Sequence, residues 1–535
     1  MVPPAPAPST NARGSWGSTL GFVLAASGSA IGLGNIVFFS SNAYQYGGGA
    51  FYLPYFLALF ALGIPVMIVE FALGTRTRRS FPMALYKIAG RRGLFVGWWT
   101  QANTFFITTF YVTILAWALG MLAGALGSLF ESGVTAPFAP FETPSEGPSA
   151  AAYFFNMIAT GWPLLYVPVV WSLNVLALRR GTESIERVVR VFVPLMWLFM
   201  IGLVVRGLTL DGGVEGVLYL FTPDWQGIAS PGVWKGAFAQ MFFTLSLGLG
   251  AMTAYASYLP KRTDAVSTAS LVAFLNCGFE YVAGIAIFSL LFAFALNPAG
   301  STLTLSFFAI PQGIAVLPWG TRLFGATFFL LLVTAGLTSS ISLVESQVSA
   351  LIDGLRLSRT QALALVAVPG TLGSMAFALP QVIDPVLAGN GTLGLTLLDV
   401  MDHWAFNYSL LTSGLFTCLL VGWALGADRL RCVVNDTSAI RLGRWFNGLL
   451  RYVAPGMLGT VVVWSLTDEF ASGRLYGAEM ALGDYGWIPY VVPLVWLGGS
   501  LGVASYLTFG RQPSRKTPTA QTTNDANQRL IGATT

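Results

Sequence analysis

The sequence predicts an all-α polytopic membrane protein, and three observations support that prediction. Of the 535 residues, 55% are hydrophobic and only 10% are charged, whereas about a quarter of the residues in a soluble protein are charged. The apolar residues gather in long segments, and one helical span needs about 20 such residues. The basic residues concentrate in alternate connections between these segments. These features argue against a soluble globular enzyme and leave little chain for a soluble domain.

The apolar segments number about twelve, each long enough for one transmembrane helix. We expect the spans at 18–42, 49–73, 95–128, 162–178, 187–206, 236–259, 265–297, 321–352, 361–380, 394–426, 446–467 and 487–509.

The basic residues predict the orientation. With the N-terminus inside, 24 of the 28 Lys and Arg residues face the cytoplasm, as the positive-inside rule requires. This topology accounts for the net charge of +5 without any nucleic-acid partner. We therefore expect a multi-pass protein of the inner (plasma) membrane with both termini cytoplasmic. Residues 1–15 and 511–535 would be disordered cytoplasmic tails because they are polar or rich in Pro and Ala.

Residues that carry catalytic or metal chemistry are scarce. The chain has one His and three Cys, which are Cys277, Cys418 and Cys432, and this set predicts neither a metal-ligand cluster nor a disulfide framework. No nucleophile–base pair or organic-cofactor motif is apparent in the sequence. We therefore expect neither an enzyme nor an organic cofactor.

Two apolar segments are interrupted at matching positions. The first reads LGFVLAASGSAIGLGNIVFFS and the sixth reads FAQMFFTLSLGLGAMTAYASY. Gly weakens a helix, and polar side chains are costly in hydrocarbon. Gly28-x-x-x-Gly32 also fits a helix-packing motif. Each interrupted segment, however, is the first of five consecutive predicted spans. We therefore favour two broken helices around a binding site near the middle of the membrane. Such breaks free carbonyl oxygens for a cation and N–H groups for a carboxylate.

Six stretches of the sequence match one known family. They are WGSTLGFVLAASGSAIGLGNI at 16–36, GGGAFYLPY at 47–55, GIPVMIVEFALG at 63–74, FFTLSLGLGAMTAYASY at 242–258, AGLTSSIS at 335–342 and MDHWAF at 401–406. From about Arg13 to the twelfth span, the sequence resembles the neurotransmitter:sodium symporter family, particularly its bacterial leucine-transporter-like members. The resemblance implies two inverted five-helix repeats, at 16–206 and 207–427, followed by two C-terminal helices within 428–510.

The resemblance also implies a sodium-coupled secondary active symporter that works by alternating access. Two sodium sites follow from it, built from oxygen ligands without fixed charge. The first would use the Ala30 carbonyl, Asn35, Thr244, Asn276 and the substrate carboxylate. The second would use the carbonyls of Gly28, Ile31 and Ala335 and the hydroxyls of Thr338 and Ser339. The Thr-Ser-Ser run also has an ordinary interpretation, in which its hydroxyls bond back to their own helix.

The implied substrate is a neutral, apolar amino acid. Gly32 stands where the monoamine carriers of the family have an acid, and it leaves room for a substrate carboxylate. The implied backbone contacts are Ala30, Leu33, Gly34, Phe243, Thr244 and Ser246, with the Tyr111 hydroxyl. The implied side-chain pocket is Ile107, Tyr111, Phe243, Ser246, Leu249, Ser339 and Leu343, which is mostly apolar.

Acidic residues within the spans call for separate interpretations. An acid in hydrocarbon is a functional candidate by default. Glu280 stands where chloride-dependent members have a small hydroxyl residue, so the resemblance implies that its carboxylate replaces chloride. Glu70 is interpreted as a structural hydrogen-bond partner, and the resemblance implies no role for Glu345.

The two gates differ in how well they match the family. Arg13 and Asp353 match the cytoplasmic gate pair, and Tyr258 matches the tyrosine that supports it. At the external gate Asp402 and Gln240 are retained, but Phe38 and Ser40 replace the usual Arg and Pro. The only histidine, His403, follows Asp402, although adjacent helical residues do not face each other. Either Phe38 forms a hydrophobic plug or Asp402 meets another donor.

The altered external gate leaves a receptor-like relative, which binds an amino acid with weak or no transport, as the alternative function. A passive channel would be recognised by uptake that never exceeds equilibrium. The expected partners are the lipid bilayer and a small neutral amino acid. The sequence predicts no nucleic-acid partner and does not give the oligomeric state.

Overall fold

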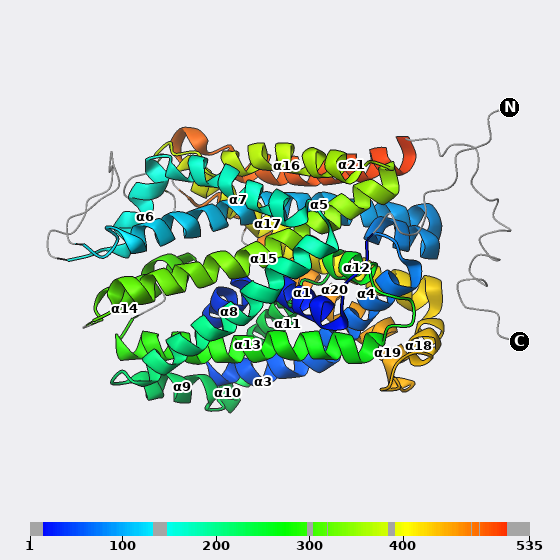
Figure 1. Ribbon diagram of the computed structural model, residues 1–535, viewed down its shortest axis with the longest axis horizontal. Helices are drawn as coiled ribbons and strands as arrows, with labels where there is room; N and C mark the ends of the chain where they lie inside the picture. Colours follow the sequence, from blue (N-terminus) through cyan, green and yellow to red (C-terminus); the bar gives the residue numbers. More distant parts are fainter. Residues whose placement is uncertain are drawn as a thin grey trace, which may run out of the picture.

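The computed structural model describes residues 14–131, 147–296, 303–317, 319–383, 391–471, 473–480 and 482–510. Over these residues the chain is a bundle of helices, with one isolated antiparallel bridge between Val382 and Thr392 (Figure 1). The predicted gate residue Arg13 lies outside the described residues, as does nearly all of the two predicted tails.

Helices follow one another along the whole described chain, and several contain a π-helical turn, labelled η. In the first part they are α1 (Thr19–Ala30), η2 (Gly34–Phe38), α2 (Phe39–Gln45), α3 (Gly49–Ala58), η3 (Leu59–Gly63), α4 (Ile64–Thr77), α5 (Phe81–Leu126), α6 (Ala150–Ala159), α7 (Trp162–Leu178), α8 (Thr182–Leu208), α9 (Gly213–Phe221) and α10 (Trp225–Ile228). The next are α11 (Pro231–Thr244), α12 (Ala251–Ala256), α13 (Ala265–Ala293), η4 (Thr304–Ala309), α14 (Ile310–Ala315), α15 (Thr321–Leu355) and α16 (Arg359–Ala376). The last are α17 (Leu393–Leu419), η6 (Leu420–Gly426), α18 (Ala427–Asn435), α19 (Trp445–Gly448), η7 (Leu449–Val453), α20 (Ala454–Ala471), the 3₁₀ turn η8 (Gly483–Tyr485), α21 (Ile488–Ser505) and η9 (Tyr506–Gly510).

The predicted fold class is confirmed. Within the described residues eight helices are long and apolar enough to cross a membrane, and two bent helix pairs raise the number to ten. The other two predicted spans coincide with α16 and with the interrupted pair α11 and α12. α11 and α12 are separated by a break, so neither helix is long enough to cross a membrane by itself.

Both predicted helix breaks are present. α1 ends at Ala30, Ile31 is extended, and α1 and the following helix are bent by 62°. Between α11 and α12 the chain is left-handed at Ser246, Gly248 and Gly250, with φ of 53°, 73° and 72°. A non-glycine residue in this region is strained, and such strain persists only where the surroundings hold it.

The structure also departs from the predicted element boundaries. α5 begins at Phe81 instead of 95, and it bends at Ala89 and Gly90, where Gly90 has φ of 56°. The connections predicted as external contain the short helices α6, α9, α10 and α14. Each of these helices is too short to form a span, so hydropathy did not reveal them.

The buried fraction of each helix shows whether it lies at the centre of the bundle or at its periphery. α15 runs through the middle of the bundle (Figure 1), and 89% of its most apolar stretch is buried. The corresponding value is 28% for the helix of Thr182–Leu208 and for that of Gly483–Gly510. Apolar side chains on these outer helices face hydrocarbon, so α15 can carry polar residues that the outer helices cannot.

Candidate functional site

The two helix breaks meet at one carbonyl oxygen. Ser246, in the break between α11 and α12, donates its hydroxyl to the Ser29 carbonyl at 3.2 Å. Ser339 of α15 donates to the same carbonyl at 2.8 Å. Three segments far apart in the sequence are thereby joined at the end of α1, next to the residues predicted to bind substrate and ions.

The residues predicted for the first sodium site form one contiguous network. Asn35 of η2 donates to the Asn276 side chain of α13 at 2.7 Å, and Asn276 donates to the Thr244 hydroxyl at 3.0 Å. The Gly32 N–H donates to the Asn35 side-chain oxygen at 2.8 Å, which fixes the turn after α1. Ala30, the last residue of α1, is also buried. These neutral oxygens are the kind of ligand that a hard cation prefers.

Glu280 of α13 adjoins this network and is fully buried. Its carboxylate accepts hydrogen bonds from the Thr244 hydroxyl at 2.6 Å, from the Gln240 amide at 3.2 Å and from the Tyr55 hydroxyl. Thr244 therefore contacts both Glu280 and Asn276, which places a carboxylate one side chain away from the predicted sodium ligands. The sequence pattern did not single out Tyr55, although it lies in the GGGAFYLPY stretch.

The residues predicted for the second sodium site lie where α1 meets α15. Thr338 bonds back to the Ala335 carbonyl at 2.8 Å, as the ordinary interpretation expects, whereas Ser339 reaches across to α1. A Cβ at Gly28 would lie 2.8 Å from the Val193 side chain and 3.6 Å from that of Thr338. The close approach of α1 to α8 therefore depends on Gly28, whereas a Cβ there would make only an ordinary contact with Thr338 of α15. Ile31 completes the set at the extended residue that follows α1.

The residues predicted for the substrate surround the break after α1. A Cβ at Gly32 would contact the Ser339 hydroxyl and lie 3.1 Å from the Tyr111 hydroxyl. The Leu33 N–H points at that same Tyr111 hydroxyl at 3.5 Å. The ring of Phe243 covers Gly34, where a Cβ would lie 2.7 Å from the ring. The apolar members Ile107, Leu249 and Leu343 are 3%, 5% and 5% exposed.

Glu70 of α4 supports the second break, as its structural interpretation expects. Its carboxylate accepts the Gly248 N–H at 2.8 Å, and the N–H and hydroxyl of Thr253 at 3.2 and 3.1 Å. These backbone groups have no helical partner at the break. Glu70 thus replaces hydrogen bonds that an unbroken helix would make itself.

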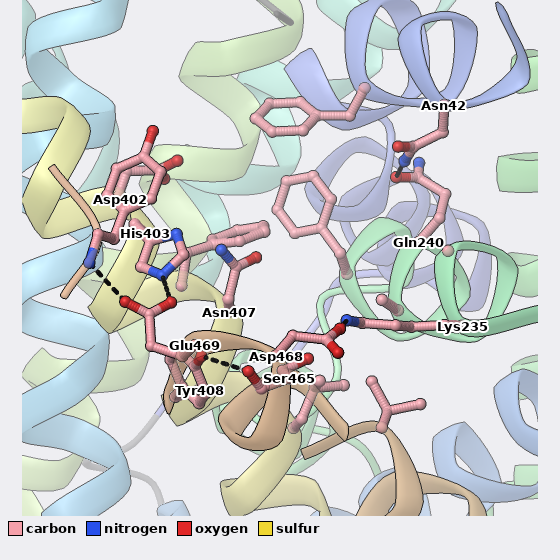
Figure 2. A pocket seen from close by; sticks show the side chains of 18 of the residues that line it. Asn42, Lys235, Gln240, Asp402, His403, Asn407, Tyr408, Ser465, Asp468 and Glu469 are labelled. Carbon is pink, nitrogen blue, oxygen red and sulfur yellow. Dashed lines mark hydrogen bonds and ion pairs between the residues drawn. The ribbon is translucent and has the colours of Figure 1, made fainter. Parts of the chain in front are cut away.

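A cavity of about 910 Å³ lies outside Phe243, among α2, α11, α17 and α20. Figure 2 shows Asn42 and Gln240 on one side of it and Asp402 and His403 on the other. Asn42 donates to the Gln240 side chain at 3.1 Å. The three residues predicted for the external gate, Phe38, Asp402 and Gln240, all line this cavity.

Three phenylalanines close the floor of the cavity. Phe243 packs edge-on against Phe406 with ring centroids 4.3 Å apart, and Phe38 lies 5.0 Å from Phe243 and 5.9 Å from Phe406. Within the described residues, the Asp402 side chain makes no hydrogen bond and no ion pair. Phe406 belongs to the MDHWAF stretch, but no pattern in the sequence indicated its contact with Phe38.

His403 contacts the end of α20 and the connection that follows it. Its ring contacts the Glu469 carboxylate at 3.0 Å and stacks on Tyr476 with centroids 3.8 Å apart. The Tyr476 hydroxyl donates to Asp399 at 3.1 Å. Burial, and then the Asp399 charge, raise the pKa of Tyr476, so this hydroxyl stays a neutral donor. His403 therefore fixes the rim of the cavity.

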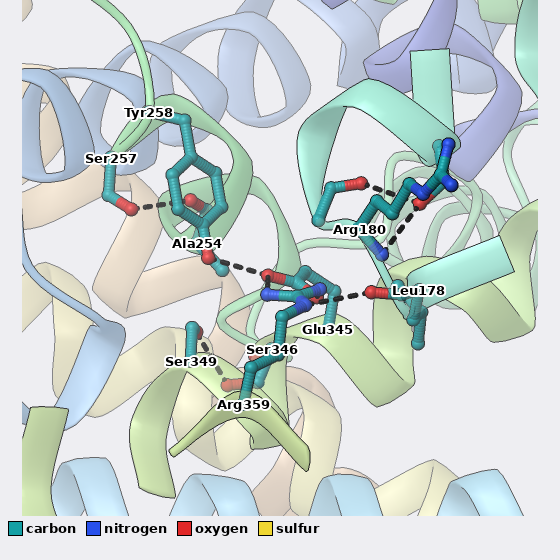
Figure 3. A network of polar contacts seen from close by, with 11 residues as sticks. Leu178, Arg180, Ala254, Ser257, Tyr258, Glu345, Ser346, Ser349 and Arg359 are labelled. Carbon is teal, nitrogen blue, oxygen red and sulfur yellow. Dashed lines mark hydrogen bonds and ion pairs between the residues drawn. The ribbon is translucent and has the colours of Figure 1, made fainter. Parts of the chain in front are cut away.

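Where α15 meets α16, the structure gives the Glu345 side chain partners that the sequence did not indicate. Figure 3 shows its buried carboxylate between Tyr258, which donates at 2.5 Å, and the guanidinium of Arg359. Arg359 also donates to the Leu178 carbonyl at 2.7 Å. Asp353 lies further along the same helix, α15, and accepts a hydrogen bond from the Ser80 N–H at 2.7 Å. The sequence features that could have predicted this pair are an acidic residue in the eighth predicted span and an Arg just before the ninth.

A comparison with protein families gives the class of this protein. The model of the sodium:neurotransmitter symporter family matches residues 13–130 and 155–480. The chain belongs to this family. Its members are sodium-dependent membrane transporters and not enzymes, so sodium is an ion that they use with a small substrate.

Relatives of known sequence and structure agree with this family. An uncharacterized sodium-dependent transporter of Methanocaldococcus jannaschii is 38% identical over 86% of this chain and 92% of its own length. The human sodium- and chloride-dependent GABA transporter 2 is 28% identical over 85% of this chain and 80% of its own. The crystal structure of MhsT in complex with L-phenylalanine superposes with a TM-score of 0.72, at 32% identity, over 84% of this chain and 99% of MhsT.

We predict that the Glu345–Arg359 pair stabilises the packing of α15 against α16. Glu345→Gln or Arg359→Gln alone should lower the free energy of unfolding by about 3 kcal/mol, because each leaves a buried charge without its partner. The double replacement should cost less than the sum of the two. Thermal unfolding of the purified variants measures these differences.

The exposed pair of Glu183 and Arg187, 3.0 Å apart on α8, serves as the matched control. Its removal should change stability by less than about 0.5 kcal/mol. Additive losses at Glu345 and Arg359 would contradict the prediction.

Proposed function

We propose that this chain is a symporter that imports a neutral, apolar amino acid together with sodium by alternating access. One observation carries the proposal. Both helix breaks converge on the Ser29 carbonyl, and neutral oxygen-bearing side chains surround that point. A cation and a carboxylate can share such a place, since the backbone there offers both C=O and N–H groups.

An amino acid fits the proposed site better than an amine. Gly32 offers no acid to meet a substrate amine, and a side chain there would require the Ser339 and Tyr111 hydroxyls to move. The side chains beside it are mostly apolar and buried, which favours an apolar substrate. The L-phenylalanine bound by MhsT is a substrate of this kind.

We assign two sodium ions to the sites predicted from the sequence. Two charges that cross a membrane potential of 100 mV contribute about 4.6 kcal/mol, and a tenfold sodium gradient adds about 2.8 kcal/mol. At perfect coupling this drives roughly 10⁵-fold accumulation of a zwitterion. That is ample for scavenging an amino acid.

The proposal includes independence from chloride. The Glu280 carboxylate lies beside Thr244 and is held by Gln240 and Tyr55, so it can supply a fixed negative charge next to the first sodium ion. A chloride ion at the same point would be repelled by that carboxylate.

For the external gate we favour an aromatic plug over an ionic pair. Phe38 packs against Phe243 and Phe406, and Asp402 has no partner among the described residues. On the cytoplasmic side, Asp353 remains the proposed gate acid, with Arg13 as its partner and Tyr258 beside it. Both termini are placed in the cytoplasm, and the protein in the inner (plasma) membrane.

The replacement of the gate arginine by Phe38 keeps a receptor-like function as the second candidate. Such a protein would bind the amino acid in the same pocket but would complete the transport cycle slowly or not at all. Transport and binding measurements on the same preparation separate the two functions.

We predict that proteoliposomes with an inward sodium gradient and no chloride will accumulate a labelled neutral amino acid. Thr338→Val should lower the apparent sodium affinity about tenfold or more, because it removes a proposed ligand. Thr334→Val, one turn away on α15 and also bonded to its own helix, should leave that affinity unchanged. Sodium-dependent binding without accumulation would favour the receptor-like function, and passive equilibration would indicate a channel.

We predict that Glu280→Ser converts the protein into a chloride-dependent transporter. The substitution removes the fixed charge and leaves a small hydroxyl beside Thr244, so an anion must then supply the charge. Uptake with and without chloride measures this effect. Glu70→Gln, which alters another buried acid, should create no chloride requirement. Equal uptake by Glu280→Ser in both media would refute the assignment.

We predict that Phe406→Ala accelerates release of bound substrate to the outside by about tenfold, because two ring contacts are lost. Asp402→Asn should change this rate little, since the carboxylate has no partner in the described residues. Phe416→Ala, on the same helix but packed on Trp99, is the control. Dissociation of labelled substrate from the purified protein gives the rates. Fast release from Asp402→Asn alone would point to an ionic gate.

A further inference from the structure

The connection between α18 and α19 is held in one conformation. Asn435 at the end of α18 exchanges two hydrogen bonds with the Leu442 backbone, at 3.0 and 2.8 Å. The Ala439 N–H donates to the Asp264 carboxylate at 2.8 Å. Although burial acts to raise it, the pKa of Asp264 is held below its usual value by hydrogen bonds from Ala439 and Ser267. The connection is thus tied to α13 through a charged anchor.

This connection turns four side chains outward, which we name the Arg–Trp face: Ile440, Arg441, Arg444 and Trp445. Ile440 is 57% exposed and Trp445 is 60% exposed. Both arginines are exposed as well. The Trp445 indole lies over Gly443, where a Cβ would be 2.7 Å from the ring. Gly443 therefore leaves room for the indole of Trp445, which directly follows Arg444 in the sequence.

Arg441 and Arg444 have no side-chain partner in the described residues, unlike other arginines nearby. Arg451 pairs with Asp428 at 3.0 Å, and Arg76 donates to the Val433 carbonyl and to Thr437. Within the described residues the side chains of Arg441 and Arg444 make no hydrogen bond and no ion pair. Two guanidinium groups are therefore available to a ligand from outside the chain.

The position of the face indicates what that ligand is. The span Leu393–Asn435 ends just before the connection, and the span Trp445–Ala471 starts at one of its residues. α18 and α19 lie together at one corner of the bundle (Figure 1). The face thus lies where hydrocarbon gives way to head groups, a level that suits an exposed Trp and Ile beside arginines.

We propose that the Arg–Trp face binds the head group of one anionic phospholipid of the cytoplasmic leaflet. The guanidinium groups of Arg441 and Arg444 would hold the phosphate, for which their planar donor array is well suited. Ile440 and Trp445 would lie against the glycerol and upper acyl chains. The choice of leaflet rests on the orientation given under the proposed function.

A lipid titration of the full-length protein tests the proposal. The purified protein in a non-ionic detergent is titrated with dioctanoyl phosphatidylglycerol, and bound lipids are counted by native mass spectrometry. Because each Arg near the surface contributes about 1 kcal/mol, Arg441→Gln with Arg444→Gln should weaken binding about 30-fold. Gly443→Val, which keeps both charges but displaces the indole, should weaken binding by a smaller factor.

The matched control is Arg91→Gln with Arg92→Gln. These arginines are another exposed adjacent pair, placed after the bend of α5, and their loss changes the net charge equally. The control should bind phosphatidylglycerol like the unmodified protein, and dioctanoyl phosphatidylcholine should bind to none of the variants. Equal loss in both double variants, equal binding of phosphatidylcholine, or unchanged binding after loss of Arg441 and Arg444 would each overturn the proposal.

Cys432 on α18 tests the leaflet separately. It is exposed, whereas Cys277 and Cys418 are buried, so a membrane-impermeant maleimide should label this position alone. Labelling should require permeabilised cells and should disappear in Cys432→Ser. Labelling of intact cells would overturn the leaflet assignment and the proposed orientation, while the lipid titration in detergent would still stand.

Discussion

Hydrocarbon offers no hydrogen bonds, so every backbone group freed by a helix break must find a partner inside the protein. This constraint explains the contacts of several buried polar residues. Glu70 accepts the N–H groups of Gly248 and Thr253. The Leu249 carbonyl accepts from Thr104 and Ser346, and the Ser29 carbonyl accepts from two serines. The polar face of α15 and the buried Glu70 on α4 therefore both provide hydrogen-bond partners for the backbone at the helix breaks. The same arrangement leaves oxygens pointing at one another at the centre, which is what an ion site needs.

The two sides of the molecule are closed by different kinds of contact. On one side, where α15 meets α16, a carboxylate, a guanidinium and a phenol meet at Glu345, which is fully buried. At the floor of the outer cavity three phenyl rings pack together, and the nearest acid takes no part. Aromatic contacts weaken little with ionic strength, whereas exposed charge pairs are screened. As the proposed external gate, this aromatic contact would therefore depend little on the salt concentration of the medium.

Much of the fold was predictable because hydrocarbon forces long apolar segments and because the basic residues mark one side. The helix breaks were predictable from Gly and polar residues in two matching segments. The short helices α6 and α9 were not, since tertiary packing and not hydropathy defines them. At the site, Asn35, Thr244 and Asn276 followed from the family motifs, and the structure brings them together. The contacts of Phe406, Arg359 and Glu469 join elements distant in the sequence, and single-sequence patterns carry no information about such pairs.

Gln240 links the outer cavity to the buried acid. Its side chain lines the cavity, accepts from Asn42 at 3.1 Å, and donates both to the Gly34 carbonyl at 3.3 Å and to Glu280 at 3.2 Å. Glu280 itself has no exposed surface. Toward the cavity, the polar path from Glu280 therefore runs through one amide that also holds the backbone after the first helix break. A rearrangement of the cavity that moves Gln240 must change the hydrogen bonds of Glu280 and of Gly34 together. The charge beside the first proposed sodium site and the geometry of the broken helix are thus coupled through a single side chain.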